Sequence, residues 1–169
     1  MTNKEQEQEF IALMQQHQAL LYKICRVYVT HEADREDLYQ EMVIQLWKSY
    51  SGFRGDSKFS TWMYRIALNT AISSLRKKSR KISISYPETI PRIAEEGKDN
   101  SYEEQINTLY AAIAQLTELE RAVVTLYLED KSYEEMEEIL GFSKGALRVK
   151  MNRIKQKLRK HTKASIHGT

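Results

Sequence analysis

The sequence predicts an all-α protein composed of two small helical domains. Apolar residues recur at steps of three and four through most of the chain, which is the spacing of one face of an α-helix. The two prolines, Pro87 and Pro91, lie close together near the middle, and helical periodicity is lost around them. The strand-like run at 82–85 is too short to matter. A length of 169 residues suits two small domains.

Three helices are expected before the prolines. The first is long and amphipathic, and its apolar face carries Phe10, Leu13, Met14, His17, Leu20, Leu21, Ile24 and Tyr28. The second has its apolar positions at Leu38, Met42, Leu46 and Trp47. Glu36 and Asp37 lie near the start of this second helix, where negative charge suits the helix dipole. The third helix carries Trp62, Ile66 and Leu75, and either Ser60 or Thr61 is expected to cap its start.

An acidic segment, residues 83–104, separates the two helical blocks. It contains six carboxylates, two cations and both prolines. An acidic, aperiodic segment of this kind is typical of a flexible linker, and a simple soluble tether would have the same composition. We therefore place a first domain at residues 1–82, the linker at 83–104, a second domain at 105–163 and a short tail at 164–169.

Two helices are expected at the start of the second domain. The first of them has its apolar positions at Ile106, Leu109, Tyr110, Ile113 and Leu116. Thr117 then precedes Glu120 at the spacing of a capping box, which indicates that another helix begins there. Its apolar positions are Val123, Val124 and Tyr127.

The segment 132–160 predicts a helix-turn-helix. Gly141 follows the apolar positions of a short helix, where glycine most easily adopts a left-handed stop, and Ser143 offers a hydroxyl to cap the next helix. In that next helix one narrow apolar stripe is formed by Leu147, Met151, Ile154 and Leu158. The face opposite this stripe, with its flank, carries Arg148, Val149, Asn152, Arg153 and Gln156.

The two helices of this motif differ sharply in charge. The first contains four glutamates, whereas the stretch from Lys144 to Lys163 contains nine Lys or Arg residues and no Asp or Glu. A basic helix behind a glycine turn suits the major groove of DNA, because it must approach a dense line of phosphates. A solvated basic face is the plain alternative, but the turn, the acidic partner helix and the mixed polar face together favour DNA.

A second nucleic-acid signal lies in the third helix of the first domain. Aromatic residues at 59–65 precede a basic run at 76–81, which suits single-stranded or distorted nucleic acid. The glycine-containing loop 51–56 is a candidate pocket for an extruded base. Taken alone, Trp62 and Ile66 at helical spacing are more typical of a core, and cations suit the carboxyl end of any helix.

Several functional classes are disfavoured. The chain has no Ser/His/Asp set, phosphate-binding glycine loop or metal-ligand spacing, so we expect no enzyme activity, cofactor or metal. The polar N-terminus lacks the apolar core of a signal peptide, and no apolar run reaches transmembrane length. Cys25 lies among apolar residues and is expected to be a buried free thiol of a cytoplasmic protein.

The order of these motifs resembles the extracytoplasmic-function (ECF) sigma factors, members of the sigma-70 family that direct bacterial RNA polymerase to promoters. The similarity extends from Phe10 to Lys160. It includes DREDLYQE, then LWKSYSGFRGDSKFSTWMYRIALNTAISSLRKKSRK, then the helix-turn-helix. The resemblance implies a sigma region 2 domain at 1–82 and a sigma region 4 domain at 105–163. It also implies binding to the polymerase core and to promoter DNA, without covalent chemistry.

The resemblance implies roles for three sets of residues. Contacts with the core polymerase are assigned to Asp37, Leu38, Gln40 and Glu41. Recognition and opening of the promoter −10 element is assigned to Thr61, Trp62, Arg65, Asn69, Ser73, Arg76, Lys77 and Lys78. Reading of the −35 element is assigned to Lys144, Arg148, Val149, Asn152 and Arg153. In the major groove Arg suits guanine, Asn suits adenine and Val suits the thymine methyl group.

Two positions depart from the family pattern, and one partner is implied by the family alone. Many relatives have Asp where this chain has Ser73, and most have a small residue where it has Glu137, which either shifts the angle between the two helices or faces outwards. The implied further partner is an anti-sigma protein that covers both domains. In the family the linker passes through polymerase channels, where an acidic peptide could mimic RNA.

Two other functions stay open at this point. A classical transcriptional regulator would use only the helix-turn-helix and would bind its operator alone, usually as a dimer. An interaction protein would bind polymerase or another regulator without reading DNA. The stretches DLYQE and FSTWMYRIALN favour a sigma factor over the regulator.

Overall fold

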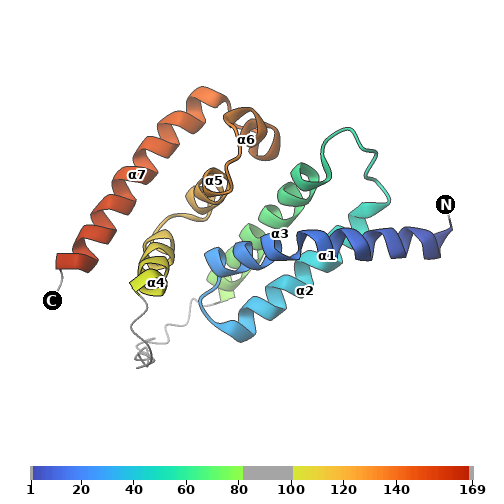
Figure 1. Cartoon of the computed structure of the whole chain (residues 1–169), viewed down its shortest axis with the longest axis horizontal. Coiled ribbons are helices and arrows are strands. Elements are labelled where there is room, and N and C mark those ends of the chain that lie inside the picture. Colours follow the sequence, from blue (N-terminus) through green and yellow to red (C-terminus); the bar gives the residue numbers. More distant parts are fainter. Residues whose placement is uncertain (1, 82–100, 168–169) are drawn as a thin grey trace.

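The computed structural model describes residues 2–81 and 101–167, and the side chains within those ranges except at 79–81 and 163–167. Within these residues the chain forms helices and no strand, which confirms the predicted all-α class (Figure 1). The helices are α1 (Asn3–Tyr28), α2 (Glu32–Tyr50), α3 (Phe59–Lys81), α4 (Ser101–Ile113), α5 (Glu118–Leu128), α6 (Tyr133–Leu140) and α7 (Lys144–His167). Most of the predicted linker, with the run at 82–85, lies outside the described residues. Its last four residues, 101–104, form the first turn of α4.

Helices α1, α2 and α3 pack against one another as a three-helix bundle. Its largest fully buried side chains include Leu21, Ile24, Met42, Leu46 and Tyr64, which come from all three helices. The boundaries of two helices differ from the prediction. Helix α2 begins at Glu32, so the predicted acidic start lies in its second turn, and α3 begins at Phe59, so Ser60 and Thr61 lie inside the helix instead of capping it. Cys25 is buried, and burial raises the pKa of its thiol to about 11.

Helices α4 to α7 form the second group, and the local signals in its sequence are confirmed. The Thr117 hydroxyl accepts a hydrogen bond from the Glu120 amide, and the Glu120 carboxylate accepts one from the Thr117 amide, which completes the capping box. Gly141 ends α6 with φ 81° and ψ 7°. The Ser143 hydroxyl accepts a hydrogen bond from the Ala146 amide at the start of α7.

The two groups pack side by side and share one hydrophobic core. Helix α3 lies against α5 and α6, while α1 lies against α4 and α5 (Figure 1). None of the described helices combines the length and the apolar composition needed to cross a bilayer. The described part of the chain also holds no cluster of three or more His, Cys, Asp or Glu side chains that could bind a metal ion.

Candidate nucleic-acid and polymerase interfaces

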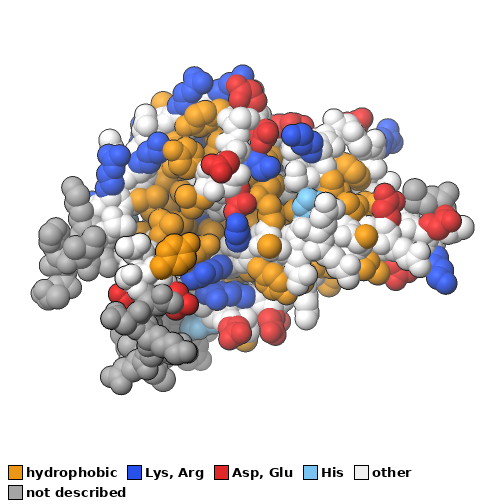
Figure 2. All heavy atoms as spheres, in the orientation of Figure 1, with side chains coloured by type: hydrophobic (Ala, Val, Ile, Leu, Met, Phe, Trp, Pro, Cys, Tyr) orange, Lys and Arg blue, Asp and Glu red, His pale blue; other side chains and the backbone are white. Residues whose placement is uncertain are grey.

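The helix-turn-helix of α6 and α7 presents a mixed polar face to solvent. Leu147, Met151 and Ile154 are buried, so the apolar stripe of α7 packs inward as predicted. The residues assigned to −35 reading lie on the other side: Arg148, Asn152 and Arg153 are exposed, as is Val149 at 51%. In Figure 2, Lys and Arg side chains gather along the edge occupied by α7 in Figure 1.

Neighbouring side chains of α6 contact two of these cations. Lys144 forms an ion pair with Glu134 at 3.1 Å, and the Arg148 guanidinium lies 5.3 Å from the centre of the Tyr133 ring. Backbone hydrogen bonding at the start of α6, together with Lys144, lowers the pKa of Glu134. Glu137 is exposed, so it faces outwards. The acidic helix α6 therefore orients the basic end of α7 through side-chain contacts as well as through the turn.

A second polar face runs along α3. Arg65, Asn69, Ser73 and Arg76 follow one another at steps of four, four and three, and all four are exposed. Lys77 and Lys78 are also exposed, and Lys78 lies 3.5 Å from Asp34 of α2. The four residues at these steps therefore share one side of α3, whereas Lys78 projects from a different side, towards α2.

Thr61 and Trp62 lie differently from the other residues assigned to the −10 element. Thr61 is 4% exposed, so its side chain belongs to the core. Trp62 is half-buried, with ring centroids 5.0 Å from Phe53, 5.4 Å from Phe59 and 6.2 Å from Tyr50. The aromatic run at the start of α3 is therefore a packed cluster that includes the end of α2 and the loop after it.

This aromatic cluster borders a cavity of about 390 Å³ at the loop predicted to receive a base. Its lining residues are Gln6, Glu9, Leu13, Tyr50, Ser51, Phe53, Gly55 and Phe59. Gly55 has φ 77°, a backbone conformation that few residues other than glycine adopt. Sequence reasoning missed Gln6 and Glu9, because exposed polar residues near the start of an amphipathic helix carry no signal of what they face.

A third polar face lies on α2. Asp37 and Gln40 are exposed and Glu41 is half-exposed, whereas Leu38 is 3% exposed and packs in the core. Ile44, one turn beyond Gln40 and Glu41, is 51% exposed. Because positions 37, 40, 41 and 44 share one side of a helix, this face joins carboxylates to an outward-pointing aliphatic group. Sequence periodicity did not single out Ile44, since apolar residues are expected inside.

Known families match both halves of this architecture. The family described as Sigma-70 region 2 matches residues 13–81, and the family described as Sigma-70, region 4 matches residues 106–158. The RNA polymerase sigma-H factor of Pseudomonas aeruginosa is 30% identical over 164 residues, covering 90% of this chain and 84% of the relative. The ECF RNA polymerase sigma factor SigW of Bacillus subtilis is 27% identical over 169 residues, covering 93% of this chain and 90% of the relative.

Solved structures share the fold at lower sequence identity. The sigma factor RpoE of Bartonella quintana, solved with the anti-sigma factor NepR, superposes with a TM-score of 0.72 at 19% identity, covering 92% of this chain and 97% of that one. CnrH, solved with the cytosolic domain of CnrY, gives a TM-score of 0.68 at 20% identity, covering 94% and 90%. With both sigma-70 regions matched in order, this chain belongs to the ECF sigma factors of the sigma-70 family.

Proposed function

We propose that this chain binds the core of bacterial RNA polymerase, directs it to promoters through −35 and −10 elements, and helps to open the DNA before transcription starts. One observation carries the proposal. A region 2 bundle and a region 4 helix-turn-helix occur in that order, and each carries exposed polar side chains on one side of a helix. Such a factor acts in transcription initiation by binding and catalyses no reaction itself. It would act in the cytoplasm, where the polymerase is found.

Helix α7 would read the −35 element in the major groove. Arg148 and Arg153 are exposed donors suited to guanine, and Asn152 is suited to adenine. Val149 is half exposed and offers an aliphatic surface to a thymine methyl group. Lys144 lies at the amino end of the helix, where the helix dipole is also positive. It would contact a phosphate there.

Helix α3 and the adjoining loop would hold the −10 element as it opens. Asn69 would hydrogen-bond a base edge, and Arg76, Lys77 and Lys78, which are all exposed on the same helix, would contact phosphates. The cavity beside the aromatic cluster is large enough for an unstacked base, and ring stacking there is tolerant of sequence. The Glu9 carboxylate at its edge could accept a hydrogen bond from an exocyclic amino group.

The polar face of α2 would bind the polymerase core. Asp37, Gln40 and Glu41 would pair with the clamp helices of the largest subunit, as the resemblance implies. Leu38 would support this face from inside, because it is buried in the bundle. Ile44 lies at the carboxyl end of this face, and an exposed aliphatic group beside polar ones suits an interface anchor.

An anti-sigma protein is the further partner we propose. RpoE of Bartonella quintana and CnrH were each solved in complex, with the anti-sigma factor NepR and with the cytosolic domain of CnrY respectively. A partner of the same kind for this chain would compete with polymerase or DNA for the three polar faces. The segment proposed to enter the polymerase channels lies mostly outside the described residues.

Run-off transcription with purified core polymerase on fragmented genomic DNA from the source organism tests the function. We expect discrete transcripts that appear only when this protein is added. Replacing Arg148 and Arg153 together by Ala should change which promoters are used, since removing one base-reading arginine costs about 1–3 kcal/mol. A matched control removes two charges further along the same helix, at Arg159 and Lys160. It should weaken all promoters alike.

Two other outcomes would refute the proposal. If no transcripts appear while the protein alone retains specific fragments, the chain is a classical regulator. If neither transcripts nor retained fragments appear with core polymerase that a known sigma factor activates, the chain is an interaction protein that does not read DNA.

A further inference from the structure

An aromatic ring of α6 supports one of the two arginines assigned to the −35 element. The Arg148 guanidinium lies 5.3 Å from the centre of the Tyr133 ring, within the distance of about 6 Å over which a cation and a ring attract each other. Arg148 is exposed, and none of the ion pairs among the described residues includes it. The ring therefore contacts Arg148 without neutralising its charge.

The neighbouring cation on the same flank of α7 is held in a different way. Lys144, one turn before Arg148, pairs with the Glu134 carboxylate at 3.1 Å. A carboxylate takes up both the charge and a donor of its cation, so DNA would have to displace Glu134 from Lys144. A ring instead binds a guanidinium through its flat face and leaves the N–H groups at the edge free. Arg148 is thus held in place while it can still donate hydrogen bonds to a base.

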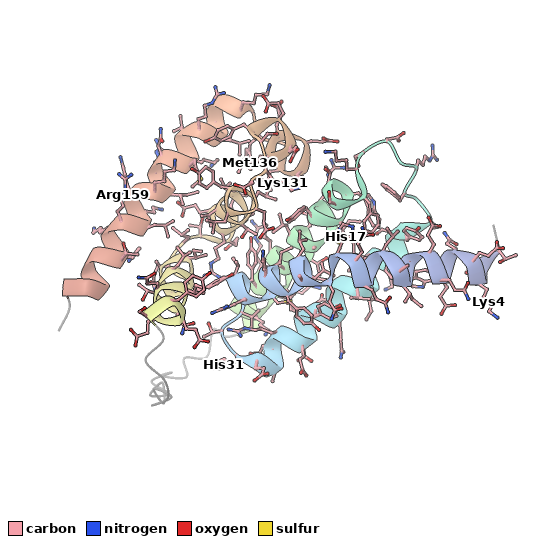
Figure 3. All side chains as sticks on the ribbon, in the orientation of Figure 1. Lys4, His17, His31, Lys131, Met136 and Arg159 are labelled. Atoms are coloured by element: carbon pink, nitrogen blue, oxygen red, sulfur yellow. The ribbon has the colours of Figure 1, made fainter. Side chains whose placement is uncertain are left out.

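The Tyr133 ring is itself fixed by the packing of α6. Tyr133 is the first residue of this helix, and the Ser132 hydroxyl caps the helix by accepting a hydrogen bond from the Glu135 amide. The ring is half-buried and packs against the hydrophobic core. Met136, one turn further along α6, is fully buried where α6 meets α7 (Figure 3). The ring is therefore a firm support for the longer and more flexible side chain of Arg148.

We propose that Tyr133 is a positioning residue for base reading: its ring holds the Arg148 guanidinium ready to donate two hydrogen bonds to a guanine of the −35 element. The inference rests on the proposed role of α7 in the major groove. An unrestrained arginine loses conformational freedom when it binds a base. Because the ring already restricts Arg148 in the free chain, less entropy is lost on binding and guanine is favoured more strongly. Tyr133 itself would touch no base.

Proton NMR of the free chain tests the contact. Protons above an aromatic ring resonate upfield, so the δ-protons of Arg148 should be shifted in the wild-type chain. Tyr133→Leu should return these signals to their ordinary positions, whereas Tyr133→Phe keeps the ring and should leave them shifted. Arg148 signals that do not respond to Tyr133→Leu would overturn the proposal, because they would show that the ring does not hold the guanidinium.

Binding of the polymerase holoenzyme tests the reading role. The DNA probes are a promoter found by run-off transcription and its single-base-pair variants through the −35 element. Arg148→Ala should lose discrimination at one base pair by about fivefold or more. Tyr133→Leu should lose about 2- to 5-fold at that same pair, which is the contribution of an exposed cation–ring contact, and Tyr133→Phe should lose none. Added to Arg148→Ala, Tyr133→Leu should cause no further loss, because it acts through that arginine.

Tyr127 of α5 provides a matched control. The Lys155 ammonium, two turns beyond Arg148 on α7, lies 4.8 Å from the centre of the Tyr127 ring. Tyr127→Leu therefore makes the same substitution and removes a similar contact, but from a cation that is assigned to no base. Discrimination should stay unchanged at every base pair. Equal losses from Tyr127→Leu and Tyr133→Leu at the pair read by Arg148 would contradict the proposal.

Two further results would refute a positioning role. A uniform loss of affinity across all −35 variants would show that Tyr133→Leu acts through the fold alone. A further loss of discrimination when Tyr133→Leu is added to Arg148→Ala would show that Tyr133 does not act through Arg148. A wild-type holoenzyme that does not distinguish −35 variants would refute the proposed function of α7 and the reading role with it. The NMR measurement needs neither polymerase nor promoter, so it would still show whether the contact exists.

Discussion

Replacing Gly141 with alanine is expected to destabilise the protein by about 1–2 kcal/mol. Gly141 ends α6 with φ 81°, in the left-handed region that an alanine Cβ disfavours. An added Cβ would meet no heavy atom within 4 Å, so no clash contributes and the whole effect comes from the backbone conformation. Gly141→Asn should cost less than alanine, because asparagine adopts this conformation more readily.

Gly145 provides a control four residues further along the chain. It lies in the first turn of α7 and also has no atom within 4 Å of an added Cβ, but its backbone is helical. Gly145→Ala should therefore stabilise the protein by about 0.5 kcal/mol, the opposite sign to Gly141→Ala. The two variants make the same chemical change in similarly open surroundings, so they separate backbone conformation from every other effect.

Urea unfolding followed by circular dichroism measures both effects. With an m value of about 1–3 kcal/mol/M, the midpoint of Gly141→Ala should fall by roughly 0.3–2 M, while that of Gly145→Ala rises slightly. Equal shifts in the same direction for both variants would refute the argument, because they would show that the left-handed turn does not determine the cost. Since this turn sets the direction of α7 relative to α6, Gly141→Ala should also weaken −35-dependent transcription.

Three further predictions concern a cap, a titrating group and an interface. Thr117→Ala should cost about 0.5–2 kcal/mol of unfolding free energy by removing the α5 cap. A loss no larger than that of Thr2→Ala, which removes the cap at the exposed start of α1, would contradict this. Burial, and then the charge of Lys131, lower the pKa of His17 below its usual 6.5. The neutral imidazole therefore contributes stability that is fully present above pH 6.5 and declines as the pH falls towards the lowered pKa. His17→Gln should flatten that decline between pH 7.5 and 5.5, and parallel curves would disprove the assignment. Ile44→Glu should leave the unfolding free energy within about 0.5 kcal/mol but weaken core-polymerase binding by at least about fivefold. Ile11, on α1, is about as exposed, and Ile11→Glu should not weaken core-polymerase binding. Equal losses of affinity for the two variants in a binding titration would rule out a specific contact at Ile44.

Local sequence signals predicted the parts of the fold that depend on neighbouring residues. The capping box at Thr117, the left-handed stop at Gly141 and the Ser143 cap each involve residues no more than four apart, and all three are confirmed. Helix starts were harder to predict where polar residues form the first turn. Helix α2 begins before its apolar positions, and α4 begins at Ser101, within a segment whose acidic composition resembled a linker.

The faces of the candidate sites were predictable only in part. A motif indicates which stretch of chain is involved, but packing decides which side chains reach solvent. Leu38 and Thr61 are therefore buried beside exposed neighbours. Contacts between distant residues leave no periodic trace. The bond from Arg65 to Glu138 joins positions 73 residues apart, so it could be found only in the folded chain.

The aromatic cluster at the start of α3 also provides an intrinsic fluorescence signal for binding at the loop cavity. The chain has two tryptophans, and both Trp47 and Trp62 lie in the first bundle. The Trp62 ring lies beside the rings of three residues that line the loop cavity. A nucleobase entering that cavity would stack near the indole and quench its emission. Helices α4 to α7 contain no tryptophan, so −35 binding would leave the signal largely unchanged. Intrinsic fluorescence can thus time the capture of an unpaired base separately from duplex recognition, without any added dye.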